Sequence, residues 1–424
     1  MANFEVIIIG AGAAGLMAAN VLQEHDVKVC ILEARDRIGG RIHDIDTEKM
    51  GHLHLGASWL HRKGENHILQ PLLDQHHVTY LKEDALESSE KMEIYTEHGK
   101  LSGKDKKLFM EILIRLPKDI RIIGQQQPTL SVADVVTLIG KKHHYSQSLI
   151  QALITRSTEH CSLNADVMPA SAFDGWEPNG LFVKDGFGKL MHQLSNQINI
   201  ELNTIVKCID QTDHNVLIDT NKKRFSCHRV ISTLPTGVLQ SGQVKFVPPL
   251  PANKKIALSQ LDSGNHEKIF LKFPSVFWDE DTEVFQLATP SSRGVCTQWY
   301  NPLLKAENQK ILYTNISGPD IAYANKSDRA LQDICMTQLR QIFGDHIPDP
   351  ESIYVTRWSL DPFTLGGPYA HPTMAGEMAH LSTIGQPFDH IHFAGVDTSE
   401  SETETVEAAL LSGIRAANQI LSAI

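Results

Sequence analysis

The chain has 424 residues, of which 42% are hydrophobic and 21% are charged, as is typical of a globular protein with two or three domains. Its 39 basic and 50 acidic residues give a net charge of −11, and no basic cluster suggests contact with nucleic acid. No apolar run reaches the roughly 18 residues that span a bilayer, and the N-terminus lacks the basic start of a signal peptide. We therefore expect neither nucleic acid nor a membrane as a partner.

The cysteines and histidines indicate a cytoplasmic protein without a bound metal. The six cysteines are scattered along the chain with no C-x-x-C spacing, so we expect reduced thiols in a reducing compartment. The 21 histidines show no metal-ligand spacing.

The first predicted elements are a strand, a glycine-rich turn and a helix. Residues 6–9 form a short apolar run typical of a strand buried on both faces, and a helical pattern covers residues 13–24. Between them, Gly10, Gly12 and Gly15 form the motif G-x-G-x-x-G. In this motif the first glycine allows a tight turn, the second lets the backbone approach a pyrophosphate, and the third lets helix and strand pack closely.

An acidic residue follows the next predicted strand. This strand covers residues 28–32 and ends at Glu33, whose carboxylate would accept hydrogen bonds from the ribose hydroxyls of an adenosine. An acid at this position argues against a ribose 2′-phosphate and therefore against NADP. The order of strand, glycine turn, helix, strand and acid predicts a dinucleotide-binding unit.

The rest of the chain alternates between helical and strand patterns. Helices are expected between residues 106 and 159, and short antiparallel strands after residue 200. The last helix carries an apolar stripe with a period close to 3.6 residues. After residue 160 the predicted elements are a helix over 189–197, strands over 200–202, 206–210, 216–219, 224–228 and 230–234, more strands between 269 and 313, and helices over 329–343 and 405–424.

The glycine motif continues into a second phosphate-binding pattern. Residues 33–41 read E-A-R-D-R-I-G-G-R, where a glycine doublet lets the backbone approach an anion and an arginine can neutralise it. With this extension the chain resembles the flavin-dependent amine oxidases, a family of monoamine oxidases, polyamine oxidases and flavin histone demethylases. Further segments resemble the family in the same order along the chain: 56–61, 230–239, 266–271, 357–362, 393–395 and 405–407.

The resemblance implies an α/β fold with two domains and FAD as the cofactor. The FAD-binding domain would be Rossmann-like and discontinuous, covering 1–81, 191–250 and 356–424. An α+β substrate-binding domain would cover 82–190 and 251–355. Pro368 stands where monoamine oxidases carry the cysteine that links to the flavin, so non-covalent FAD is expected. The implied cofactor-binding residues are Gly10, Gly12, Ala13, Ala14, Gly15, Glu33, Ala34, Arg35, Gly40, Arg41, Gly56, Ala57, Ser58, Trp59, Val206, Thr233, Trp358, Gly395, Asp397 and Val406.

The family's chemistry implies four catalytic residues in this chain. The reaction is hydride transfer from the carbon beside an amine nitrogen to flavin N5, with oxygen as the final acceptor and hydrogen peroxide as a product. Lys268 matches a lysine that holds a water near N5, and Tyr369 matches one wall of an aromatic cage. Thr405 stands at the second wall, and His61 stands where some polyamine oxidases sense their substrate. Small-molecule amines, polyamines first, are therefore the expected substrates, and no specific protein partner is inferred.

Three departures from the family pattern keep other functions open. Val396 replaces the usual acid after Phe-Ala-Gly, and Glu404 and Ala408 replace the usual glycines around the Thr-Val-x triplet. These changes allow a flavin-binding regulatory protein with impaired catalysis. A related oxidoreductase acting on a polyene or an L-amino acid is a further alternative, and the amino acid would require an arginine facing the flavin. A histone demethylase is disfavoured, because such relatives carry additional chromatin-binding domains.

Overall fold

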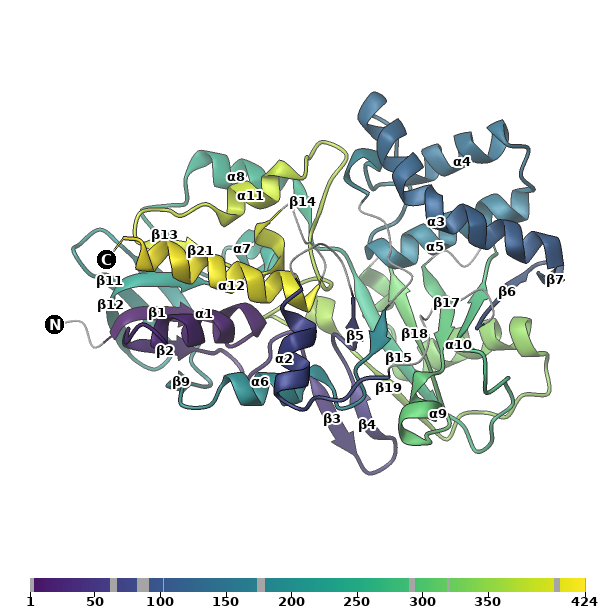
Figure 1. Cartoon of the computed structure of the whole chain (residues 1–424), viewed down its shortest axis with the longest axis horizontal. Coiled ribbons are helices and arrows are strands. Elements are labelled where there is room, and N and C mark those ends of the chain that lie inside the picture. The colour runs from purple at the N-terminus through teal and green to yellow at the C-terminus, as the bar shows by residue number, and fades with distance from the viewer. Residues whose placement is uncertain are drawn as a thin grey trace.

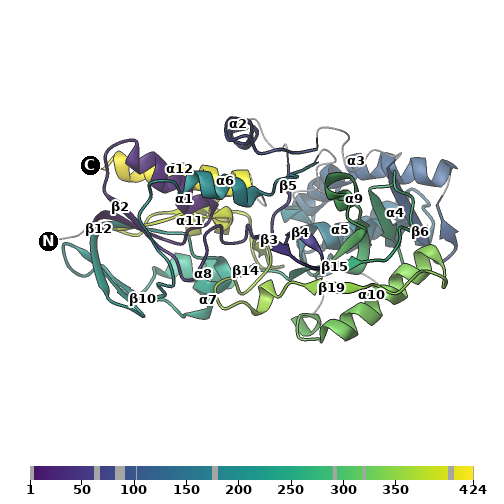
Figure 2. The same ribbon diagram turned by 90° about the horizontal axis from the view of Figure 1, so that it is seen from below.

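A computed structural model describes residues 4–61, 67–81, 91–101, 103–173, 180–289, 294–318, 321–399 and 405–423, without the side chains of 159–161 and 321. The described residues form two halves, each built around one large β-sheet (Figures 1 and 2). Glu404 lies outside the described residues. No helix within the described ranges is long and apolar enough to cross a membrane.

The first half is a mostly parallel, eight-stranded sheet with helices on both faces. Helices α1 and α12 pack against each other on one face, beside α6, while α7, α8 and α11 lie towards the other (Figure 1). The strand order is β13-β10-β11-β12-β1-β2-β9, and β21 also pairs with β12. The strands are β1 (Phe4–Ile9), β2 (Val29–Leu32), β9 (Ile200–Glu201), β10 (Val206–Asp210), β11 (Val216–Thr220), β12 (Arg224–Ser232), β13 (Lys245–Val247) and β21 (Ile391–Phe393). The helices are α1 (Ala13–Gln23), α6 (Phe187–Leu194), α7 (Thr236–Ser241), α8 (Ala252–Ser259), α11 (Ala379–Gly385) and α12 (Val406–Leu421).

Strand β1 shows why the opening sequence folds this way. Val6 and Ile8 pack into the core that contains α1 and α12, while Ile7 and Ile9 pack into the core on the opposite face. Side chains alternate between the two faces of a strand, and both faces of this sheet are covered, so all four side chains are buried. Parallel pairing of β1 with β2 and β12 confirms the predicted doubly covered, Rossmann-like sheet.

Three predicted strands differ from the expectation, one in its pairing and two in their continuity. The strand at 200–202 was expected to be antiparallel, but β9 pairs in parallel with β2 at the sheet edge. The predicted strands at 224–228 and 230–234 are one continuous strand, β12. Its first residues pair with β11, and its last ones pair with β1 and β21. One strand thus joins the antiparallel and the parallel parts of the sheet. The spacing of residues along the sequence does not show this continuity.

The second half is a seven-stranded mixed sheet with the order β19-β15-β18-β17-β16-β6-β7. Helix α5 packs on β17 and β18, and α3 and α4 pack with α5, whereas α10 contacts β16, β17 and β19 (Figure 1). The strands are β6 (Met92–Thr96), β7 (Gly99–Lys100), β15 (His266–Lys272), β16 (Val284–Leu287), β17 (Val295–Tyr300), β18 (Ile311–Ser317) and β19 (Ser352–Val355). The helices are α3 (Gly103–Gln126), α4 (Val132–Lys142), α5 (Gln147–Cys161), α9 (Pro302–Glu307) and α10 (Asp328–Phe343). The helices expected over 106–159 and 329–343 are confirmed.

Short elements connect the two halves. Hairpin β3–β4 and the β5–β8 pair lie between the large sheets, and β14 pairs with β20 (Figures 1 and 2). Helix α8 packs its Ala257 and Leu258 into the core of the first sheet, although the prediction assigned residue 251 onwards to the other domain. The domain boundaries themselves stay a prediction. The short elements are β3 (Asp44–Thr47), β4 (Gly51–His54), β5 (Trp59–Leu60), α2 (Leu69–Gln75), β8 (Leu181–Phe182), β14 (Leu261–Asp262) and β20 (His371–Pro372).

Candidate active site

A cavity of about 800 Å³ lies between the two halves. Ile9, Leu32 and Thr233, at the carboxyl ends of β1, β2 and β12, line one end of it. Lys268 and Tyr313, from strands of the second sheet, line the other end. The carboxyl edge of a parallel sheet is where open α/β folds bind their ligands, so the cavity is the candidate active site.

The glycine turn brings bare backbone to the first end of the cavity. Gly10 has φ +103°, and a Cβ there would lie 2.4 Å from Thr233 Oγ1. A Cβ on Gly15 would lie 2.0 Å from the Gly10 carbonyl oxygen, so only glycine lets α1 pack here. Gly12 lines the cavity, and the nearest atom to a Cβ there would be 3.9 Å away. The three glycines thus have the turn, approach and packing geometry that the motif predicts.

Glu33 ties this turn to the end of β2. Its Oε2 accepts a hydrogen bond from Ala11 N at 2.8 Å, and its Oε1 accepts one from Arg35 N at 2.9 Å. The side chain is only 4% exposed and lines the cavity. Since each carboxylate oxygen has a second lone pair, Glu33 can shape the loop and still accept ribose hydroxyls.

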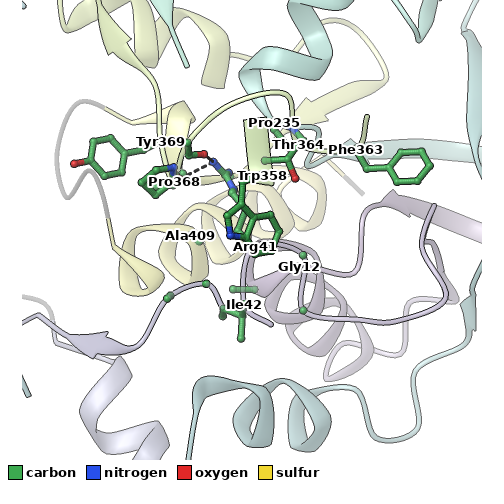
Figure 3. A pocket seen from close by; sticks show the side chains of 18 of the residues that line it. Gly12, Arg41, Ile42, Pro235, Trp358, Phe363, Thr364, Pro368, Tyr369 and Ala409 are labelled. Atoms are coloured by element: carbon green, nitrogen blue, oxygen red, sulfur yellow. Dashed lines mark hydrogen bonds between the residues drawn. The ribbon is translucent and has the colours of Figure 1, made fainter. Parts of the chain in front are cut away.

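Two arginines border the same end. Arg35 Nη2 pairs with Asp361 Oδ2 at 2.8 Å. Arg41 Nη1 donates to the Pro368 carbonyl oxygen at 2.6 Å, the contact drawn in Figure 3, and lies 4.0 Å from Asp397 Oδ2. Guanidinium groups beside an open glycine turn suit a diphosphate, because they supply directed N–H donors and positive charge.

These residues fit FAD. The cavity combines a glycine cradle that a Cβ would fill, a buried acid at the predicted ribose position and flanking cations. Two of the predicted cofactor-binding residues, Gly15 and Asp397, do not line it. The others do: Gly10, Gly12, Ala13, Ala14, Glu33, Ala34, Arg35, Gly40, Arg41, Gly56, Ala57, Ser58, Trp59, Val206, Thr233, Trp358, Gly395 and Val406.

Asp397 stabilises the cavity wall without lining the cavity itself. Its Oδ1 accepts from Ala370 N at 2.8 Å and its Oδ2 from Thr236 Oγ1 at 2.9 Å, while Val396 faces the cavity. The carboxylate therefore anchors the segment that carries Tyr369 to the start of α7.

Trp358 is fixed at the cavity wall by a buried acid. Glu267 is fully buried and accepts hydrogen bonds from Thr356 Oγ1, Trp358 N and Ser359 N at 2.7–2.8 Å. The Trp358 indole donates to the Leu55 carbonyl oxygen at 3.1 Å. The ring orientation is thus determined by hydrogen bonds at both its backbone and its side chain.

Lys268 is a buried cation at the second end. Its Nζ donates to the carbonyl oxygens of His54 at 3.1 Å and Gly56 at 2.6 Å, and to Ser58 Oγ at 2.9 Å. Burial lowers the pKa of Lys268 to about 7, against the opposing effect of the Asp44 charge. A lysine with a pKa near neutrality can hold or release a proton at the pH where an enzyme works.

The remaining predicted catalytic residues meet around the same space. Tyr369, Thr405 and His61 all line the cavity. Tyr369 is 7% exposed and packs edge-on against His371, with ring centroids 4.7 Å apart. Thr405 also caps α12, since its side chain accepts from Ala408 N at 3.0 Å. Their roles in catalysis stay predictions.

Sequence comparison assigns the chain to a known family. Residues 157–421 match the family described as flavin containing amine oxidoreductase, and residues 8–76 match the NAD(P)-binding Rossmann-like domain. The chain belongs to the flavin containing amine oxidoreductase family. This confirms the family that the sequence motifs predicted.

Two relatives show the range of this amine oxidoreductase family. Probable polyamine oxidase 4 of Arabidopsis thaliana is 30% identical over 97% of this chain and 86% of its own. Lysine-specific histone demethylase 2 of Homo sapiens is 28% identical over 99% of this chain and 53% of its own. A solved structure of putrescine oxidase bound to putrescine has the same fold, with a TM-score of 0.82, 19% identity and 99% coverage of both chains.

Several cavity residues of this amine oxidoreductase were missed in the sequence. Tyr300 and Tyr313 stack with ring centroids 4.9 Å apart and an interplanar angle of 16°, and Trp59 Nε1 donates to Tyr313 Oη at 3.0 Å. Asn315 lies opposite Lys268 in the β15–β18 register. Alternation along residues 311–317 could have placed Tyr313 and Asn315 on one face, but only the pairing shows that this face meets Lys268.

A buried arginine also lines the substrate end. Arg156, on α5, is 7% exposed, and its Nη1 donates to Gln298 Oε1 at 2.7 Å. Tyr300 Oη donates to the same oxygen at 2.5 Å, so the guanidinium is connected to the aromatic stack. Glu33 is the one carboxylate among the described cavity-lining residues. Nowhere in the described ranges do three or more His, Cys, Asp or Glu side chains gather as a metal site requires.

The two described departures from the family pattern lie together. Val396 and Ala408 form a small buried apolar cluster with Tyr369. They therefore shape the wall beside the predicted cage residue, and the third departure, Glu404, is outside the described residues.

Proposed function

We propose that the protein is an FAD-dependent amine oxidase that acts on small amines, with polyamines as the first class to test. The observation that carries this proposal is the continuity of one cavity from the glycine turn to Lys268 and Tyr369. Similarity to polyamine oxidases over most of both chains supports it. FAD, when bound, would supply an acceptor for the hydride of the carbon beside nitrogen, and oxygen would take up the electrons as hydrogen peroxide.

The chain's own residues have three tasks in this proposal. The glycine turn, Glu33 and Arg41 hold the non-covalent cofactor, since Pro368 has no thiol to form a link. Tyr369 offers an aromatic face to an amine that is protonated before reaction and neutral during it. Lys268 holds a proton at Nζ inside the cavity, where it assists flavin reoxidation and imine hydrolysis.

A second candidate is an amine that also carries a carboxylate, such as an amino acid. Arg156 favours it, because a buried guanidinium at the substrate end suits a carboxylate and repels a polycation. An Arg156→Gln variant would then raise KM for the carboxylate-bearing amine and leave the flavin spectrum unchanged.

Anaerobic reduction of the flavin tests both candidates. The purified yellow protein is mixed without oxygen with polyamines, monoamines, amino acids and a methyl-lysine peptide, and the loss of absorbance near 450 nm is followed. The peptide is included because histone demethylases are among the relatives. Bleaching by one class identifies the substrate, whereas bleaching by none contradicts amine oxidation and favours a regulatory flavoprotein. Acid precipitation that releases the flavin would support non-covalent binding, and cell fractionation would test the proposed cytoplasmic location.

A further inference from the structure

The β3–β4 hairpin carries two Asp–His pairs in very different surroundings. Asp44 lies opposite His54 and Asp46 opposite His52 in the antiparallel register. In each pair a carboxylate Oδ1 lies within 2.9 Å of the histidine Nδ1. The Asp44 and His54 side chains are 8% and 2% exposed, whereas those of Asp46 and His52 are 87% and 26% exposed. The first pair is therefore an internal one and the second a surface pair.

The backbone closes tightly over the internal pair. Gly188 N, at the start of α6, donates to Asp44 Oδ2 at 2.6 Å. Gly186 has φ +73°, and a Cβ there would lie 2.2 Å from Asp44 Oδ2 and 2.9 Å from His54 Nδ1. The amino end of a helix also favours a negative charge. The fold thus provides a dedicated place for the Asp44 carboxylate.

His54 connects this carboxylate to the cavity. Its ring binds Asp44, and its carbonyl oxygen accepts a hydrogen bond from Lys268 Nζ at 3.1 Å. The other two acceptors of Nζ, on Gly56 and Ser58, follow within four residues on the same chain segment. The His54 Nε2 is buried without a hydrogen-bond partner among the described residues, and the ring packs edge-on against Phe182. Holding His54 therefore holds one acceptor of the ammonium directly and the start of the segment that carries the other two.

Other ionisable groups also surround Lys268. Tyr313, on β18, has its ring centroid 5.3 Å from Nζ. On β15 itself, His266 shares the cavity face and binds Ser317 Oγ at 2.8 Å, while Glu267 points the other way towards Trp358. Burial lowers the pKa of Lys268, and Asp44 is the charge that raises it. The carboxylate of the hairpin thus opposes the desolvation of the ammonium.

We propose that Asp44 is a positioning residue for Lys268: through His54 it fixes the segment that carries the three acceptors of Nζ, and its charge favours the ammonium form. The inference rests on the proposed function, because it gives Lys268 a proton to hold beside the reacting centre. It also describes a charge coupling that exists whether or not any amine is oxidised.

A double-mutant cycle in urea unfolding tests this coupling without any enzyme assay. The flavin-loaded wild type, Asp44→Asn, Lys268→Met and the double variant are unfolded at pH 6 and pH 9. At pH 6 we expect Asp44→Asn to lower the folding equilibrium constant more in the wild-type background than in the Lys268→Met background. The two losses should differ about tenfold. At pH 9, above the folded-state pKa of Lys268, the difference should vanish.

The surface pair supplies the matched control. Asp46→Asn removes an equivalent carboxylate from the same hairpin and should show no coupling to Lys268 at either pH. Equal losses for Asp44→Asn in both backgrounds would mean a purely structural role and would overturn the proposal. Should Asp44→Asn fold only in the Lys268→Met background, the coupling is supported. Failure to fold in both backgrounds counts against it.

A second readout follows the flavin. After reduction with dithionite, the rate of reoxidation by oxygen is measured against pH. We expect its midpoint to fall by about one pH unit in Asp44→Asn and to stay in place in Asp46→Asn. An unmoved midpoint in Asp44→Asn contradicts the proposal. If no amine bleaches the flavin but the unfolding cycle shows coupling, the proposed function fails and the inference on Asp44 stands.

Discussion

The two ends of the cavity are built in different ways. At the nucleotide end, Glu33 binds Ala11 and Arg35, which lie 22 and 2 residues away along the chain. At the substrate end, Lys268 binds His54, 214 residues away, and faces residues from several other segments. The glycine turn and its acid are therefore specified by short motifs, whereas the surroundings of Lys268 depend on how distant segments pair. Variants at the two ends should fail in correspondingly different ways.

Gly15→Ala should produce the largest effect, because it breaks the local construction of the nucleotide end. The new Cβ would lie 2.0 Å from the Gly10 carbonyl oxygen, which is backbone and cannot rotate away. We expect a loss of about 3 kcal/mol in the free energy of unfolding, measured in urea. A loss below about 1 kcal/mol would show that α1 does not need close contact with the turn.

Lys268→Met should change how stability depends on pH. The pKa of Lys268 is about 7 in the folded protein, and that of a free lysine is about 10.4. Between these values the unfolded state binds one more proton, so stability rises with pH by up to about 1.4 kcal/mol per unit. Urea unfolding from pH 7.5 to 9.5 should show a shallower rise in Lys268→Met.

Lys254→Met is the control for this experiment. Burial also lowers the pKa of Lys254 to about 7, but its Nζ donates to carbonyl oxygens at the end of α11. Both variants should lose part of the pH slope, and only Lys268→Met should slow flavin reoxidation. Equal reoxidation rates in wild type and Lys268→Met would remove Lys268 from the proposed mechanism.

Gly12→Ala separates cofactor binding from folding. A Cβ on Gly12 has no protein atom closer than 3.9 Å and would project into the cavity. We expect unchanged unfolding of the flavin-free protein and about tenfold weaker FAD binding, or about 1.4 kcal/mol, by fluorescence titration. Unchanged affinity would mean that the pyrophosphate does not approach this glycine.

Thr405→Ala, in the cavity wall, should have the smallest effect. Loss of the cap on α12 should cost about 1 kcal/mol of stability, and Thr405→Ser should restore it. If Thr405 also forms a wall of the substrate site, KM should change in the alanine variant and recover only partly in the serine variant. If KM recovers in Thr405→Ser as fully as stability does, Thr405 acts only as the cap of α12.

Much of the fold could be predicted because its signals are local. The apolar run at 6–9, the glycine spacing and the stripe of the last helix each depend on residues a few positions apart. The pairing of β9 and the continuity of β12 could not be predicted, since strand partners are chosen by packing across the whole sheet.

The candidate site also combines residues that local motifs predict with residues that only tertiary packing brings together. Twenty-two of the residues named from motifs line one cavity. The other two, Gly15 and Asp397, contact residues next to its wall. Arg156, Tyr300 and Tyr313 belong to no recognisable motif and were missed. Their place in the cavity wall results from packing of α5 and from strand register.

The dinucleotide turn, the family and the residue types at each motif follow from the sequence alone, because spacing along a backbone controls local geometry. Which polar groups meet in the dry interior depends instead on how distant segments pack, and the fold settles this. It buries Asp44 against His54 and leaves Asp46 in solvent beside a half-buried His52, although both pairs belong to one hairpin. Burial makes a charge interaction strong and exposure weakens it, so the same residue types have different consequences in the two places.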